Sequence, residues 1–228
     1  MSRNLFVTGT GTEIGKTYVA GLIVKTLHDA GMDVAYYKAA MSGNDRRPDG
    51  TLIPGDALFV KEFAQLSQSL ASMCPYVYEN AVSPHLASRI EGHPVRMEVV
   101  EETFHAVSRK HDYVVVEGSG GITCPISWDE ERIQLEDIVR KLQLPSIMVA
   151  DAGLGTINSV VLTYAYMKQK ELPLKGIFFN NFHRGDVMEE DNRRMCEKMT
   201  GLPVLSCIAK GDNELPGLPA EKLAALFA

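Results

Sequence analysis

The sequence predicts an α/β fold with a mostly parallel central sheet between two layers of helices. Apolar runs of strand length alternate along the chain with segments whose apolar residues recur at helical spacing. One run, Tyr113–Val116, is apolar without a break, which is typical of a parallel strand buried on both faces. This alternation favours one sheet covered on both sides, and no linker rich in Pro, Gly or Ser interrupts it. We therefore expect a single domain over residues 1–228.

The elements follow from these patterns in chain order. A first strand, Leu5–Val7, leads into a glycine-rich loop and then a helix from Lys16 to about Ala30, which Gly31 ends. The later predicted strands are Val34–Tyr37, Tyr113–Val116, Ser146–Ala150, Gly176–Phe179 and Pro203–Ile208. The later predicted helices are Met97–Lys110, Thr156–Lys170 and Ala220–Phe227. Residues 40–55 and 118–132 are predicted to be long loops, which in a compact domain are usually functional or disordered.

The composition argues against several classes of protein. The net charge is −6 and no basic stripe is present, so we expect no nucleic-acid partner. The longest apolar runs fall far short of the ~18 residues of a membrane span. The chain enters its first strand without a secretory signal, which favours the cytoplasm. The 4 cysteines form no C-x-x-C pair, and the 6 histidines show no ligand spacing, so a disulfide scaffold or a zinc site is not expected.

Polar or glycine-rich residues follow every predicted strand except the last. Ligands of open α/β sheets bind beyond the carboxyl ends of the strands. Several such ends at one edge therefore predict one composite site. The segments concerned are Gly9–Thr17, Lys38–Ser42, Glu117–Gly121, Asp151–Gly155 and Asn180–Asn181.

The segment Gly9–Thr17, GTGTEIGKT, has most features of a phosphate-binding loop. The usual spacing is G-x-x-x-x-G-K-[ST], but the first glycine here is one residue too early. Lys16 can reach β- and γ-phosphates, Thr17 can offer its hydroxyl to Mg²⁺, and the following helix presents its positive end. A plain glycine turn is the alternative. The strand before and the helix after favour the phosphate loop, and with it a three-layer α/β/α P-loop NTPase fold.

Other polar residues at this edge allow two interpretations each. Glu13 could bind a cationic substrate or brace the loop, or it could simply face solvent. Lys38 could be a surface lysine or a second positive charge that faces the transferred phosphoryl group. Glu117 could be a Mg²⁺ partner or a loop carboxylate. For Asp56, spacing alone favours a plain helix N-cap.

With these residues in place, the chain resembles the dethiobiotin synthetases over nearly its whole length. The phosphate loop of that family is similar to G-T-x-T-E-[VI]-G-K-T, one residue longer than the common form, and Gly9–Thr17 matches it. The further matches are Lys38–Gly43 to K-P-x-x-S-G, Asp56 to an Asp at a helix start, Ser83–His85 to S-P-H, Val116–Gly121 to V-E-G-A-G-G, Gly155–Asn158 to G-x-I-N, and Asn180 to an Asn after a strand.

The departures from the family pattern are modest. Ala39 replaces a frequent proline, and Gly11 stands where Asp is common. Ile208–Lys210 lacks the usual proline on the adenine side, so no ribose or base contact is assigned there. No clear match near Asp191–Arg194 exists for the tyrosine that a partner chain often brings to the substrate.

The resemblance implies ATP-dependent ring closure of 7,8-diaminononanoate with CO₂ or bicarbonate, in biotin biosynthesis. A carbamate and a carbamic–phosphoric anhydride would be the intermediates, and ADP and phosphate would leave. ATP is the implied co-substrate and Mg²⁺ the implied cofactor. The implied assembly is a homodimer whose active sites are completed across the interface.

The resemblance also implies residue roles. The implied catalytic residues are Thr12, Glu13, Lys16 and Lys38. The implied substrate-binding residues are Ser42, Glu117 and Gly118, together with Gly155, Thr156 and Asn158, which a partner subunit supplies to the carboxylate tail. The implied nucleotide-binding residues are Thr12, Glu13, Ile14, Gly15, Lys16, Thr17, Tyr18, Asp56, Glu117 and Asn180. The implied metal ligands are Thr17, Asp56 and Glu117.

Three other hypotheses compete with this one. A division-site or nitrogenase-iron-protein-like switch ATPase would carry an early lysine in the loop, where this chain has Gly11. A cobyrinate or cobyric-acid synthase would carry a glutaminase domain with a nucleophilic cysteine, and neither Cys124 nor Cys207 has a G-x-C-x-G setting. A non-enzymatic nucleotide-binding module would have little use for Glu13, Lys38 and Glu117 around a second small-molecule space.

Overall fold

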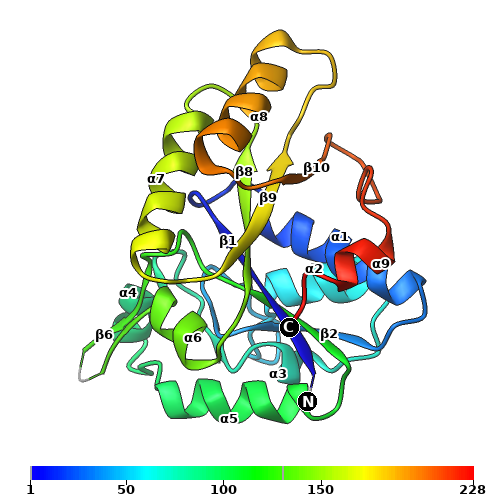
Figure 1. Ribbon diagram of the computed structural model, residues 1–228. Coiled ribbons are helices and arrows are strands. Elements are labelled where there is room, and N and C mark those ends of the chain that lie inside the picture. The colour runs from blue at the N-terminus through cyan, green and yellow to red at the C-terminus, as the bar shows by residue number, and fades with distance from the viewer. Residues whose placement is uncertain (1, 130) are drawn as a thin grey trace.

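The computed structural model describes residues 2–129 and 131–228. Its central sheet has six parallel strands in the order β10-β9-β8-β1-β5-β2 (Figure 1). This confirms the predicted mostly parallel sheet, and each predicted strand is present. The strands are β1 (Arg3–Gly9), β2 (Val34–Lys38), β5 (Tyr113–Glu117), β8 (Ser146–Asp151), β9 (Leu174–Asn180) and β10 (Val204–Cys207).

Helices cover both faces of the sheet. Successive residues of a strand point to opposite faces, and in these strands both sets are apolar, so each face needs a cover. In β1, Leu5 and Val7 join the core beneath α1, α2 and α9, whereas Phe6 joins the core beneath α5 and α6. Figure 1 shows α1, α2 and α9 on one side of the sheet and α6, α7 and α8 on the other. These helices are α1 (Lys16–Asp29), α2 (Gly55–Phe63), α5 (Met97–Ser108), α6 (Leu135–Lys141), α7 (Thr156–Gln169), α8 (Val187–Thr200) and α9 (Ala220–Ala224).

The two predicted long loops contain more structure than expected. In residues 40–55, β3 (Ala40–Met41) pairs with β4 (Tyr76–Val77) in parallel. In residues 118–132, β6 (Pro125–Trp128) pairs with β7 (Arg132–Gln134) as an antiparallel ribbon. Strands this short carry no readable periodicity, so the prediction of plain loops was wrong there. The short helices α3 (Leu70–Met73) and α4 (Pro84–Ile90) also went unpredicted, as did α6 and α8.

The register of the sheet brings charged strand ends together. Lys38 at the end of β2 is the direct partner of Glu117 at the end of β5. Tyr36, two residues before Lys38, therefore lies on the same face, and its side chain belongs to the core beneath α1 and α2. None of the described helices is long and apolar enough to cross a bilayer.

Candidate active site

The phosphate loop connects β1 to α1. At one position of this loop, the backbone has a conformation that only glycine adopts easily. Gly15, directly before the helix, has a φ of 84°. A Cβ atom placed there would lie 2.1 Å from Nδ2 of Asn180. That amide donates to the carbonyl oxygen of Ile14 at 3.1 Å and so ties the loop to the end of β9. The Gly15 conformation and the Asn180 hydrogen bond together hold the loop in this shape.

Replacing Gly15 by alanine should weaken ADP binding by about tenfold or more, because backbone strain of this kind costs roughly 1–3 kcal/mol. The new methyl group would also displace Asn180. Isothermal titration with ADP measures the effect. Gly11→Ala is the matched control, since its Cβ would meet nothing within 4 Å. Equal affinities for the two variants would contradict the requirement for glycine at position 15.

Lys16, the first residue of α1, points back over the loop. Its ammonium group donates to the carbonyl oxygen of Gly11 at 2.6 Å. Burial lowers the pKa of Lys16, while the charge of Glu117 acts in the opposite direction. A buried ammonium held by one backbone carbonyl is suited to exchange that partner for a phosphate oxygen.

Glu117 lies at the centre of a hydrogen-bonded cluster. Its Oε1 accepts from the Thr17 hydroxyl at 2.9 Å and from Lys38 Nζ at 2.6 Å, and its Oε2 accepts from the Tyr36 hydroxyl at 2.7 Å. Lys38 donates a second bond, of 2.6 Å, to Asp56 Oδ2. The side chains converge from β2, β5, α1 and α2, although they are far apart in the sequence.

Lys38 remains charged in this cluster. Burial by itself lowers the pKa of an ammonium group, but the carboxylates of Glu117 and Asp56 outweigh burial, so the pKa of Lys38 is raised. Burial, reinforced by Glu117, also raises the pKa of Tyr36 well above its ordinary value, which keeps its hydroxyl protonated. The cluster therefore combines the Lys38 ammonium group with the carboxyl groups of Glu117 and Asp56, with Lys16 adjacent.

These residues surround a cleft of about 730 Å³ at the carboxyl edge of the sheet. The structure brings the following predicted site residues to the cleft: Thr12, Glu13, Gly15, Lys16, Thr17, Lys38, Ser42, Asp56 and Glu117. Met41, Ser119 and Gly120, from the segments predicted to form the composite site, also line it, as does Gly43 from the matched motif Lys38–Gly43. Ala81, Val82 and Cys124 line it without having been predicted. Ser119 is anchored by a 2.7 Å hydrogen bond to the carbonyl oxygen of Ala40.

Other predicted site residues lie outside the lining of this cleft. Tyr18 donates its hydroxyl to the carbonyl oxygen of Asp212, in the segment after β10. Gly118 packs against Phe6 and Leu135, where a Cβ atom would come within 2.7 Å of both side chains. Close packing against these two side chains is therefore sufficient to explain why position 118 is a glycine.

The start of α7 also lies outside this lining, and Gly155, Thr156 and Asn158 with it. Gly155 takes a left-handed conformation as the N-cap. The Thr156 hydroxyl is buried without a hydrogen-bond partner, and Asn158 is exposed. Their assignment to substrate binding stays a prediction.

The donor set around Thr17 suits Mg²⁺. The carboxylates of Glu117 and Asp56 meet at buried Lys38, and the Thr17 hydroxyl contacts Glu117. Mg²⁺ prefers oxygen ligands while keeping several waters and phosphate oxygens. Over residues 2–129 and 131–228, no group of three or more His, Cys, Asp or Glu side chains forms a metal cage. A site completed by nucleotide phosphates needs no such cage.

Comparisons with known proteins identify the family. A family model described as an AAA domain matches residues 3–213. The ATP-dependent dethiobiotin synthetase BioD of Brachyspira hyodysenteriae is 47% identical over 212 residues, which cover 92% of this chain and 94% of that protein. The synthetase of the same name from Clostridium botulinum strain 657 is 46% identical over 227 residues, which cover 100% of this chain and 99% of that protein.

The chain belongs to the dethiobiotin synthetase family.

Solved structures confirm the P-loop fold of this dethiobiotin synthetase family member. The septum site-determining protein MinD of Pyrococcus horikoshii, complexed with Mg-ADP, is similar with a TM-score of 0.57 and 13% identity, over 98% of this chain and 89% of that chain. A ParA family ATPase from Chlorobium tepidum has a TM-score of 0.56 and 15% identity, over 93% and 87%. At such identities the likeness shows the fold alone. The far higher identity to dethiobiotin synthetases decides against the switch-ATPase hypothesis.

Proposed function

We propose that the chain is an ATP-dependent dethiobiotin synthetase, which closes the ureido ring of dethiobiotin from 7,8-diaminononanoate and CO₂. The observation that carries this proposal is the meeting of Lys16, Lys38, Thr17, Asp56 and Glu117 at one cleft. The phosphate loop alone would be enough for a protein that only switches between nucleotide-bound states. The second lysine and the open space beyond it suit a further small-molecule substrate.

The proposed chemistry has three steps. One amine of the substrate adds to the carbon of CO₂ and loses a proton, which gives a carbamate. A carbamate oxygen attacks the γ-phosphorus of ATP and ADP leaves, which gives a carbamic–phosphoric anhydride. The second amine then attacks the carbonyl carbon, loses a proton and expels phosphate as the ring closes.

The two lysines fit the charge that develops in these steps. Lys16 would exchange the Gly11 carbonyl for phosphate oxygens, and Lys38 would neutralise the carbamate and the transferred phosphoryl group. Fixed cations aimed at developing negative charge stabilise a transition state without reorganisation. Thr12, Glu13 and Ser42, all on the cleft wall, would orient the diamine and the carbamate.

Thr17, Asp56 and Glu117 would hold Mg²⁺, directly or through water. The ion would supply charge neutralisation for the phosphates of bound ATP. Lys38 lies between the two carboxylates, so it would share them with the ion. On the nucleotide side, Asn180 and Tyr18 brace the loop and the segment after β10.

The carboxylate tail of the substrate would bind at the start of α7 of a second subunit, so we propose a homodimer. Replacing Asn158 by glutamate should raise the Michaelis constant for the diamine by about tenfold, because a hydrogen bond to a charged group is lost and repulsion is added. The Michaelis constant for ATP should change little. Steady-state kinetics with each substrate varied in turn test this, and an equal effect on ATP would refute the assignment.

The proposed activity itself is tested by phosphate release from Mg-ATP and bicarbonate, with and without 7,8-diaminononanoate. We expect release only with the diamine, one phosphate for each cyclic urea detected by mass spectrometry. Release that ignores the diamine would instead indicate a nucleotide switch, and the search would then turn to a protein partner.

A further inference from the structure

We propose that Tyr36 is a positioning residue that orients the Glu117 carboxylate for Mg²⁺, and the inference rests on the proposed function. Sequence patterns place Tyr36 only among the apolar residues of a strand. Its hydroxyl nevertheless donates to Glu117 Oε2 at 2.7 Å. Tyr36 is 0% exposed and Glu117 is 2% exposed, so water does not compete for this bond.

The bond fixes which oxygen of Glu117 faces the cleft. A carboxylate only accepts, and the tyrosine hydroxyl has one hydrogen, so the direction of the bond is set. With Oε2 occupied by Tyr36, Oε1 is the oxygen that Thr17 and Lys38 contact. A residue that hydrogen-bonds to a metal ligand without touching the metal itself holds that ligand in one orientation.

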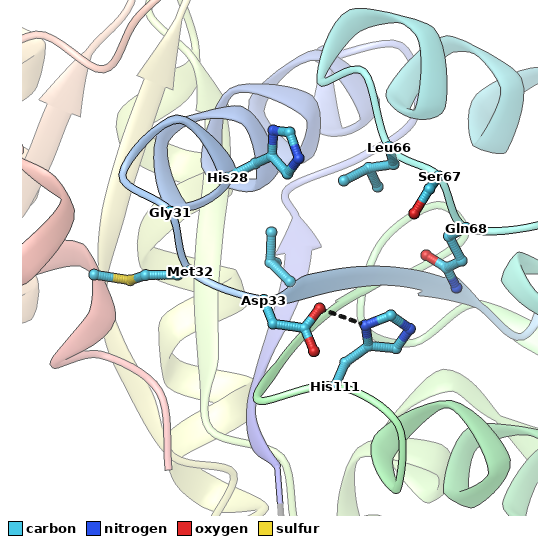
Figure 2. Close-up of a pocket in the computed structure, with 9 residues that line it drawn as sticks. His28, Gly31, Met32, Asp33, Leu66, Ser67, Gln68 and His111 are labelled. Carbon is cyan, nitrogen blue, oxygen red and sulfur yellow. Dashed lines mark hydrogen bonds and ion pairs between the residues drawn. The ribbon is translucent and has the colours of Figure 1, made fainter.

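Tyr36 is itself held by a second contact. The side-chain amide of Gln68 accepts from the backbone N–H of Tyr36 at 2.9 Å and donates to its carbonyl oxygen at 3.0 Å. Gln68 lines a small pocket of about 260 Å³ together with Asp33 and His111. Figure 2 shows these three side chains around the pocket. The backbone and the hydroxyl of Tyr36 are therefore both fixed, as a positioning role requires.

The next residue in the sequence provides a matched control. Tyr37 is also 0% exposed, and its hydroxyl contacts the Val100 carbonyl oxygen at 3.0 Å and the Thr103 hydroxyl at 2.9 Å. It points to the opposite face of the sheet, against α5, and has no contact with the cleft. Tyr37→Phe thus removes an equally buried hydroxyl without reaching Glu117.

The test measures ADP affinity by isothermal titration, once with excess Mg²⁺ and once with EDTA. In the unmodified protein, Mg²⁺ should strengthen ADP binding. In Tyr36→Phe, this Mg²⁺-dependent gain should shrink by about tenfold, the usual effect of losing such a partner. The affinity in EDTA should be unchanged. Tyr37→Phe should match the unmodified protein in both arms.

Three results would overturn the inference. The first is a Tyr36→Phe protein that keeps the full Mg²⁺-dependent gain. The second is an equal loss of affinity in EDTA, which would indicate a general packing effect. The third is the absence of any Mg²⁺ effect in the unmodified protein. The proposed function fails separately, if phosphate release does not depend on the diamine, so the two failures can be told apart.

Discussion

Replacing Lys16 by methionine should lower the rate of diamine-dependent phosphate release by about a thousandfold, since losing one preorganised donor to a transition-state anion costs roughly 10²–10³. Lys16 is the cation nearest the loop carbonyls, and it is buried at the start of α1. Methionine keeps most of the length of the side chain and removes the charge together with the hydrogen-bond donors of the ammonium group. The measurement is the steady-state rate with saturating ATP, bicarbonate and diamine.

Lys25→Met is the control for this experiment. Lys25 lies on the same helix, partly exposed, and pairs with Asp29 rather than with any cleft residue. Its replacement should leave the rate within about twofold, as surface substitutions away from special features do. A Lys16→Met protein that folds, melts normally and still releases phosphate at the original rate would remove Lys16 from the proposed mechanism.

Replacing Glu117 by glutamine should harm both activity and stability. The change leaves buried Lys38 with only one carboxylate, that of Asp56. Breaking a buried ion pair costs roughly 3 kcal/mol or more, which corresponds to a fall in Tm of about 6–12 °C in a chain of this size. The rate should fall by about a hundredfold, because the metal loses a charged ligand. Thermal melts and phosphate-release kinetics measure the two effects.

Glu136→Gln separates these two effects. Glu136 is also buried, and it pairs with Lys170 at 3.0 Å and with the Tyr166 hydroxyl, between α6 and α7. Its replacement should lower Tm, though by less than Glu117→Gln, because Lys170 is 39% exposed and can regain water. The rate at 25 °C should be unchanged. If Glu136→Gln reduced the rate as much as Glu117→Gln, the effect at Glu117 would reflect stability and not metal binding.

Sequence patterns were sufficient for the sheet and for the loop. The strands are apolar runs bounded by polar or glycine residues, and burial on both faces makes such runs easy to recognise. The segment Gly9–Thr17 could be recognised from its own residues, since the positive φ at Gly15 requires a glycine and the helix that follows has a helical pattern. These features can be recognised from the local sequence, whereas the bond from Asn180 that ties the loop to β9 joins distant parts of the chain.

The cluster around Glu117 could be predicted only in part. Asp56 seemed from spacing to be a plain helix cap, and its contact with Lys38 depends on how residues 40–55 fold back over the sheet. The Tyr36 hydroxyl went unnoticed because a tyrosine inside an apolar strand is usually core. Strand alternation offered a signal, however, since Tyr36 and Lys38 are two residues apart and must share a face.

The Gln68 amide has a consequence for association between molecules. β2 is one of the two edge strands of the sheet, and an edge strand offers N–H and C=O groups on which another chain can add. At Tyr36 both groups are already bonded to the Gln68 side chain, which therefore imitates a short piece of neighbouring strand. At this position of β2, Gln68 therefore leaves no free backbone group on which another chain could add a strand.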